Sequence, residues 1–218
     1  MTDDAALRAL RGKYRAMEER VAERLTPARW RHVEGVIETA VRLARRWGAD
    51  VEKAYLAAVL HDVAKDCSTN RLLKATLDFG IVLSKLDEAA TPLLHAPVGA
   101  AVARAEFGIV DPDVIAAIRY HTTGRAGMSL LEKIVYLADY VEPGRSFPGV
   151  EAVRALVEED LDKALLLALS QGIAHLVAQG ALIAPESIEA RNELLLQALG
   201  PGAGPESSAR GGVPDVHP

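Results

Sequence analysis

Signals that begin and end helices recur along this chain, and patterns typical of β-strands are nearly absent. In the segment 3–25, apolar residues return every three or four positions from Leu7 to Leu25, which predicts one apolar stripe on an amphipathic helix. Thr26 followed by Pro27 predicts a helix that opens with a capping hydroxyl and a proline in its first turn. The pattern therefore favours an all-α protein.

Caps, prolines and glycines divide the rest of the chain into further predicted helices. Their expected ranges are 27–48, 51–65, 68–80, 97–108, 112–124, 129–142, 150–158, 161–178 and 186–199. Ser129 and Glu132 have the spacing of a capping box, in which each side chain satisfies a free backbone amide of the other residue. We expect one helical domain over residues 1–199, with its core motifs at 26–187. Residues 200–218 are rich in Gly, Pro and Ser and are predicted to form a disordered tail.

Composition argues against nucleic acid and membrane partners. The net charge is −5 and aromatic residues make up only 5%, so neither a general electrostatic grip nor a base-stacking platform is expected. Residues 164–185 contain no Asp, Glu, Lys or Arg, but they include glycines, glutamines and a histidine, which predicts a buried helix rather than a membrane span.

The single cysteine and the N-terminal residues predict a cytoplasmic protein. Cys67 stands alone, which excludes an intrachain disulfide and a thiolate metal cluster and fits a reducing compartment. The first residues are acidic and lack the apolar stretch of a signal peptide.

The adjacent pair His61 and Asp62 is the first candidate for chemistry. On the expected helix 51–65 the pair follows Ala54 and Ala58 on one side, so it is predicted to face other helices. A buried imidazole and carboxylate are costly unless they are paired or bind a metal. Neighbouring helical positions differ by about 100°, which lets both side chains reach one ion. Such a dipeptide alone is weak evidence, because it also occurs by chance.

His32 and Asp139 strengthen the metal hypothesis. His32 lies between apolar positions of the helix 27–48, and Asp139 lies within an apolar stretch of the helix 129–142, where an isolated carboxylate needs a strong partner. Two imidazoles and two carboxylates from three helices would form an N₂O₂ site with coordination positions open for water and substrate. That donor set suits iron, manganese, zinc or a similar ion.

Several longer strings resemble one known family. They read LHDVAK at 60–65, HAPVGA at 95–100, RYHTTG at 119–124, YLADYVEP at 136–143 and RSFPGV at 145–150. In this order they resemble the YqeK-type symmetrical bis(5′-nucleosyl)-tetraphosphatases of the HD phosphohydrolase superfamily. The resemblance covers roughly residues 15–197 by motif order and shows no departure at the motif positions. It implies a helical HD domain that hydrolyses diadenosine tetraphosphate to two ADP.

The resemblance also implies which residues hold the metal and the nucleotide. Iron, or manganese in its place, would be bound by His32, His61, Asp62 and Asp139. The substrate and the ADP product would contact His32, Asp62, Val63, Ala64, Lys65, His95, His121, Thr122, Asp139, Arg145, Leu182, Ile183, Ala184, Pro185, Glu186 and Ser187. Catalytic roles are expected for Asp62, Lys65, His95 and His121.

Elementary chemistry agrees with these roles and leaves some of them open. A metal ion generates hydroxide from bound water and polarises a phosphoryl oxygen. Lys65 can reach a phosphate as a point charge, and Arg145 offers two parallel donors to one. His95 and His121 can each donate to phosphate, protonate the leaving group or hold a second metal, and the sequence does not separate these roles.

Two alternative functions remain open at this stage. Another HD phosphohydrolase, such as a nucleotidase or a cyclic-nucleotide phosphodiesterase, would use the same ligands. A non-catalytic sensor of adenine nucleotides would bind without turnover. The sequence also leaves open whether one or two metals bind, whether adenosine or guanosine is preferred, and whether the chain forms a homodimer.

Overall fold

The computed structural model describes residues 3–200, and every regular element among them is helical. The first half contains α1 (Asp3–Ala22), α2 (Pro27–Trp47), α3 (Val51–Leu60), α4 (Thr69–Asp78), α5 (Lys85–Ala89) and the 3₁₀ helix η1 (Thr91–Leu94). The second half contains α6 (His95–Phe107), α7 (Pro112–Tyr120), α8 (Leu130–Val141), α9 (Val150–Leu156), α10 (Leu161–Ala178) and α11 (Pro185–Leu199). The all-α prediction is confirmed, and the predicted tail from residue 201 onward lies outside the described residues.

The caps predicted at Thr26 and Ser129 form as expected. The Thr26 hydroxyl accepts the backbone N–H of Arg29 at 3.3 Å, and α2 ends at Gly48, whose φ of 74° lies in the left-handed region that favours glycine. Ser129 and Glu132 form the capping box at the start of α8. Local hydrogen bonds at the helix ends therefore determine most of the boundaries.

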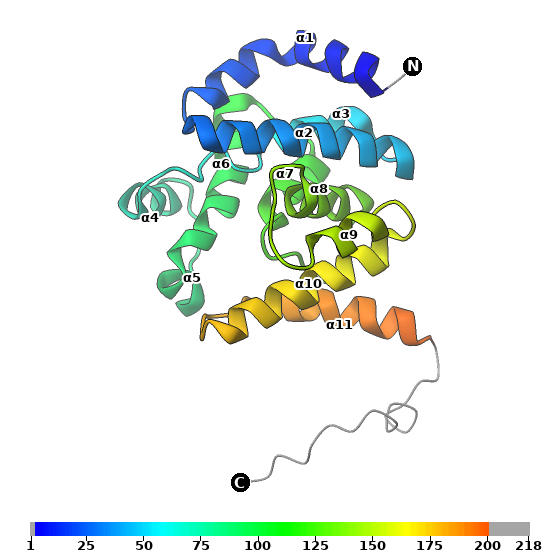
Figure 1. Ribbon diagram of the computed structural model, residues 1–218. Coiled ribbons are helices and arrows are strands. Elements are labelled where there is room, and N and C mark those ends of the chain that lie inside the picture. The colour runs from blue at the N-terminus through cyan, green and yellow to red at the C-terminus, as the bar shows by residue number, and fades with distance from the viewer. Residues whose placement is uncertain (1–2, 201–218) are drawn as a thin grey trace.

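Helix α2 is the centre of the packing. It packs against α3 on one side and α8 on another, while α7 packs against both α6 and α8. Figure 1 shows α1 at one end of the molecule and α10 with α11 at the opposite end. Buried side chains from α2, α3, α7 and α8 belong to one continuous apolar core, which surrounds the ends of α3 and α7.

Several helix boundaries differ from the sequence prediction. The helix expected at 51–65 ends at Leu60, and the chain continues in tight turns in which Val63 N–H donates to Leu60 O (3.2 Å). The helix expected at 112–124 ends at Tyr120. The helix expected at 97–108 begins two residues earlier, at His95, and the short helices α5 and η1 were not predicted. After Leu60 the apolar pattern continues through Val63 and Ala64, because the following turn is buried as well.

Helix α10 is less buried than predicted. By length and composition, it is the one helix within residues 3–200 that could cross a membrane, and 28% of its residues are buried. Its buried residues, such as Leu161, Leu165 and Leu169, belong to the first half of the helix. The prediction of a buried helix is thus wrong for the second half of α10, where Val177 is 62% exposed.

Candidate metal centre

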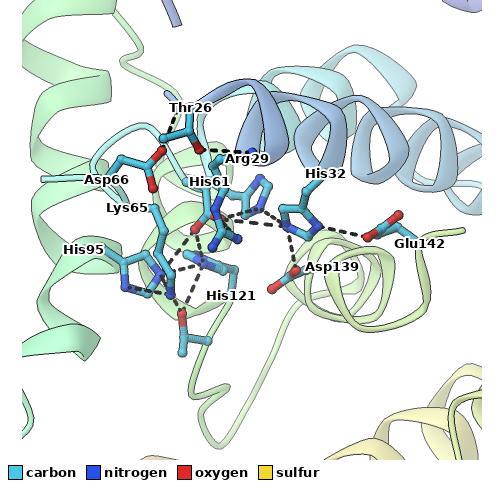
Figure 2. Close-up of polar contacts among 12 residues, drawn as sticks. Thr26, Arg29, His32, His61, Lys65, Asp66, His95, His121, Asp139 and Glu142 are labelled. Atoms are coloured by element: carbon cyan, nitrogen blue, oxygen red, sulfur yellow. Dashed lines mark hydrogen bonds and ion pairs between the residues drawn. The ribbon is translucent and has the colours of Figure 1, made fainter. Parts of the chain in front are cut away.

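The four predicted metal ligands converge from three parts of the chain. His32 comes from α2, His61 and Asp62 from the turn that ends α3, and Asp139 from α8 (Figure 2). His32 Nε2 lies 3.0 Å from Asp139 Oδ1, 3.4 Å from His61 Nε2 and 3.8 Å from Asp62 Oδ2. His32, His61 and Asp139 each offer one ligand atom within 4.8 Å of the others.

Each imidazole of the site has its Nδ1 atom held by an acceptor. His61 Nδ1 donates to Ala58 O at 2.7 Å, and His121 Nδ1 donates to Ile118 O at 2.7 Å. His95 does the same with Pro92 O at 2.6 Å. In a neutral imidazole this arrangement leaves the lone pair on Nε2, which points into the site.

His32 reaches the same tautomer through a side chain. Its Nδ1 donates to Glu142 Oε1 at 3.0 Å, which leaves Nε2 as an acceptor. Nε2 lies 3.0 Å from Asp139 Oδ1, which is also an acceptor. Two acceptors at this distance need a cation between them, either a proton or a metal ion. Neutral nitrogen and carboxylate oxygen donors suit a divalent transition metal, so the residues fit the metal that the resemblance implies.

Asp62 divides the site into two halves. We call His32, His61, Asp139 and Glu142 the acidic half, and Lys65, His95, His121 and Thr122 the basic half. Asp62 Oδ2 faces the acidic half, 3.6 Å from His61 Nε2, and Oδ1 faces the basic half, 3.3 Å from His95 Nε2.

The basic half supplies its own hydrogen-bond donors. His95 Nε2 and His121 Nε2 lie 3.2 Å apart, and the Thr122 hydroxyl lies 3.2 and 3.1 Å from them. The Lys65 ammonium lies 3.3 Å from His95 Nε2. A half-buried ammonium and a hydroxyl beside two imidazoles provide a place for phosphate oxygens.

The pKa of His32 is raised, whereas the pKa values of His61 and His95 are lowered. Burial alone would lower the pKa of His32, but its hydrogen bonds to Asp139 and Glu142 outweigh burial and raise it. The pKa of His95 falls to about 3, mainly because the ring is buried, and the nearby His121 and Lys65 contribute in the same direction. Burial also lowers the pKa of His61 to about 4, so His61 and His95 are neutral at pH 7.

The carboxylates of the centre stay ionised. Burial opposes ionisation of Asp62, but the imidazoles of His61, His121 and His95 hold its pKa well below the usual range. Asp139 behaves in the same way, because a hydrogen bond from His32 outweighs the effect of burial. Burial lowers the pKa of Lys65.

Two arginines border the cluster. Arg145 donates through Nε to Asp139 O at 2.9 Å, and its Nη2 group binds the Asp139 carboxylate. Arg29 Nη1 lies 3.1 Å from Asp62 Oδ2. The sequence reasoning identified Arg145 but missed Arg29, although Arg29 precedes His32 by three residues and so lies on the same face of α2.

A pocket of about 380 Å³ lies next to the basic half. Its wall includes Leu94 and Ala96, which flank His95, and Thr123, which follows Thr122. The opposite wall includes Ala184, Pro185 and Glu186 from the segment predicted to contact the nucleoside, together with residues 81–87, which the sequence reasoning missed. The volume falls in the usual range of small-molecule sites.

A model of the HD domain family matches residues 29–144, more than half of the chain. The chain belongs to the HD domain family. The matched span runs from Arg29, through all four predicted metal ligands and the basic half, to the turn that follows Glu142.

Curated relatives of this HD domain chain carry the name symmetrical bis(5′-nucleosyl)-tetraphosphatase. The relative from Halalkalibacterium halodurans is 47% identical, over 81% of this chain and 94% of that protein. The relative from Bacillus subtilis is 42% identical, over 80% of this chain and 94% of that protein. A crystal structure from Clostridium acetobutylicum, described as a predicted HD superfamily hydrolase involved in NAD metabolism, superposes with a TM-score of 0.81 at 41% identity and covers 84% of this chain and 96% of that one.

The predicted site residues occupy distinct positions in this HD domain. The side chains of Val63 and Ala64 are buried and belong to the apolar core. Leu182 is 54% exposed, whereas Ser187 is buried and donates to Thr123 O at 2.8 Å. Glu142 belonged to a quoted motif without an assigned role, and no local signal pairs it with His32, 110 residues earlier.

Proposed function

We propose that this chain is a metal-dependent hydrolase that cleaves diadenosine tetraphosphate symmetrically into two ADP. The observation that carries the proposal is the cluster around Asp62, in which inward-facing imidazole nitrogens and carboxylates meet the half-buried Lys65. Relatives named for this activity match almost their whole length with this chain, which supports the same assignment.

The metal ion in this proposal is iron, held by His32, His61, Asp62 and Asp139. Manganese fits the same donor set. When bound, the metal lowers the pKa of a coordinated water and polarises a phosphoryl oxygen. The family resemblance supports iron, and the two imidazoles with two carboxylates support a divalent ion in general.

The reaction adds water to one of the two central phosphorus atoms. The bond from that phosphorus to the oxygen between the central phosphates breaks, and this oxygen leaves with the second ADP, which takes up a proton. The substrate is polyanionic, so the chain must offset its charge as it binds. We assign this role to the Lys65 ammonium and to the guanidinium groups of Arg29 and Arg145, which border the cluster.

The basic half orients the phosphates in this proposal. His95 is neutral at pH 7 and accepts a hydrogen bond from Lys65, which keeps the ammonium directed into the site. Thr122 can donate its hydroxyl proton to a phosphate oxygen. The nucleoside would occupy the adjacent pocket between residues 81–87 and Ala184, Pro185 and Glu186. We extend the proposal to a cytoplasmic location, where the lone thiol of Cys67 stays reduced.

The test is a product analysis on protein purified without oxygen. The metal content is measured first, and the protein is then incubated with diadenosine tetraphosphate and the nucleotides are resolved by ion-exchange chromatography. We expect ADP as the sole product, and we expect none with Asp62→Ala.

Other outcomes would contradict the proposal in different ways. AMP with ATP would show asymmetric cleavage. Faster hydrolysis of a cyclic dinucleotide or a nucleoside monophosphate would indicate another HD phosphohydrolase. Tight ADP binding without hydrolysis under several metals would indicate a nucleotide sensor.

A further inference from the structure

Glu142 is a buried carboxylate directly after α8, on the far side of His32 from the cluster (Figure 2). Its side chain is 5% exposed. Oε1 accepts the Nδ1 proton of His32 at 3.0 Å, and Oε2 accepts the backbone N–H of Gly144. Both carboxylate oxygens therefore face a donor.

A carboxylate can accept both of these hydrogen bonds, whereas the amide of a glutamine, which has the same shape, cannot. A glutamine side chain has one acceptor oxygen and one NH₂ donor group. In one orientation its NH₂ group would face the N–H of Gly144. In the other it would donate to Nδ1 of His32, which would move the ring proton to Nε2 and remove the lone pair that faces Asp139.

The Glu142 carboxylate packs against two glycines, Gly35 and Gly144, at positions where a side chain would collide with it. A Cβ atom at Gly35 would lie 2.6 Å from Glu142 Oε2, and one at Gly144 would lie 2.9 Å from the same oxygen. Gly35 lies inside α2, where glycine destabilises a helix by about 1 kcal/mol relative to alanine. The helix is locally weaker at Gly35, and the carboxylate fits against it.

Arg154 of α9 holds the turn that carries Glu142. Its Nη2 group donates to Glu142 O at 2.7 Å and to Arg145 O at 2.8 Å, and its Nε donates to Val141 O at 2.9 Å. The backbone on both sides of the Glu142 side chain is thus fixed from a neighbouring helix.

We propose that Glu142 is a positioning residue that fixes the tautomer of His32, so that Nε2 presents its lone pair to the metal. The other three imidazoles of the site take their tautomer from backbone carbonyls, which no substitution can remove. Glu142 is the side-chain counterpart of those carbonyls. The inference rests on the proposed metal centre, and it concerns a residue that does not touch the metal.

The test measures Mn(II) affinity of the metal-free full chain from the electron paramagnetic resonance signal of free Mn(II). Glu142→Gln is expected to weaken binding about 10- to 100-fold, the usual effect of losing an outer carboxylate behind a ligating histidine. Glu132→Gln is the matched control, because Glu132 is also buried and held at both oxygens, there by Arg125, but it does not contact the centre. We expect the control to keep wild-type affinity.

A second readout follows the ring proton itself. In zinc-loaded protein with ¹⁵N-labelled histidine, the Nδ1 proton of His32 is expected as a slowly exchanging resonance. In Glu142→Gln it should shift and exchange faster with water, which a loss of overall stability alone would not cause at this single ring.

A third variant covers a failure of Glu142→Gln to fold. Gly35→Ala keeps the carboxylate but places a methyl group 2.6 Å from Oε2, and it favours the helix. It should weaken Mn(II) binding in a folded protein.

Three results would overturn the inference. The first is Mn(II) affinity within about threefold of wild type in both Glu142→Gln and Gly35→Ala, which is a smaller change than the loss of a positioning carboxylate gives. The others are an equal loss of Mn(II) affinity in Glu132→Gln, or a His32 Nδ1 proton resonance that Glu142→Gln leaves unchanged. If wild-type protein bound no Mn(II), the proposed metal centre would fail with it. If Asp62→Ala abolished binding and Glu142→Gln did not weaken it, only the role of Glu142 would fail.

Discussion

The acidic and basic halves of the site use the same side chain, histidine, in opposite surroundings. In the acidic half, carboxylates contact His32 at both ring nitrogens and raise its pKa. In the basic half, burial lowers the pKa of His95 to about 3, and the neighbouring imidazole and ammonium act in the same direction. The acidic half therefore attracts a cation and the basic half tolerates an anion, although the two are separated only by the carboxylate of Asp62.

In the proposed function, this difference allows one site to hold a metal ion and a polyphosphate side by side. A metal ligand must present a lone pair and a negative environment, whereas a phosphate needs donors and positive charge. The chain meets both requirements by changing the neighbours of its imidazoles, and it keeps the imidazoles neutral at His61 and His95.

The largest effect is expected when the Asp62 carboxylate, which faces both halves, loses its charge. Asp62→Asn keeps the shape but loses the charge, so we expect loss of Mn(II) binding and a fall in kcat/KM of at least about 10³-fold. Asp66→Asn is the control, because the nearby Asp66 carboxylate accepts only the backbone N–H of Thr26. Wild-type Mn(II) affinity in Asp62→Asn would show that the Asp62 carboxylate is not needed for metal binding, which would contradict its place between the two halves.

A pair of substitutions separates the halves from each other. Asp139→Asn should weaken Mn(II) binding and hydrolysis together. Lys65→Met keeps the side chain's length and should lower hydrolysis about 10²-fold while Mn(II) affinity stays unchanged, because the lost ammonium acts on phosphate. Titration of Mn(II) beside steady-state kinetics measures both. Weaker Mn(II) binding in Lys65→Met would contradict the division.

The pH dependence of stability sharpens the comparison in metal-free protein. His61 and His95 have folded pKa values of about 4 and 3, below the ordinary 6.5, so each lowers the free energy of unfolding as pH falls below 6.5. Between pH 7 and 5 this amounts to about 2 kcal/mol for each imidazole. His32 has a raised pKa and acts in the opposite direction: its stabilisation is present below 6.5 and is lost as pH rises through the folded value.

Urea unfolding at pH 7 and pH 5 measures this balance. His95→Gln removes one imidazole of lowered pKa, so its loss of stability on acidification should be smaller than that of the wild-type protein. An equal loss would show that His95 is not buried in its neutral form.

The smallest expected effect concerns the pocket beside the basic half. Ser187→Ala removes the hydrogen bond to Thr123 O, worth about 1 kcal/mol, so the wall formed by the start of α11 should loosen. We expect KM for diadenosine tetraphosphate to rise about fivefold with kcat and Mn(II) affinity unchanged. A change in kcat instead would show that Ser187 affects the reacting phosphates, and not only the wall of the pocket.

The sequence predicted the helical architecture and the cluster because both depend on local signals. Caps such as Ser129 with Glu132 act within one turn, and a carboxylate such as Asp139 in an apolar stretch is conspicuous from its neighbours alone. The same signal was present at Ser84 with Asp87, but the helix there has only five residues and was not predicted.

The parts that the sequence did not predict depend on contacts between distant residues or on a buried turn that continues the apolar pattern of a helix. The end of α3 at Leu60 was not predicted, because the buried turn that follows continues the apolar pattern. Arg29 contacts Asp62, 33 residues later, and Glu142 contacts His32 across 110 residues. Periodicity within one helix carries no information about such pairs.

The contacts that set the tautomers also differ in the order in which a folding chain can form them. His61, His95 and His121 each bond a carbonyl three residues earlier, so these rings can be oriented as soon as their own turn forms. The His32–Glu142 contact closes a loop of 110 residues and must wait until α2 and α8 have docked. The proposed metal centre is therefore complete only once α2 and α8 have docked, and a nascent chain that ends after α4 still lacks Asp139 and Glu142.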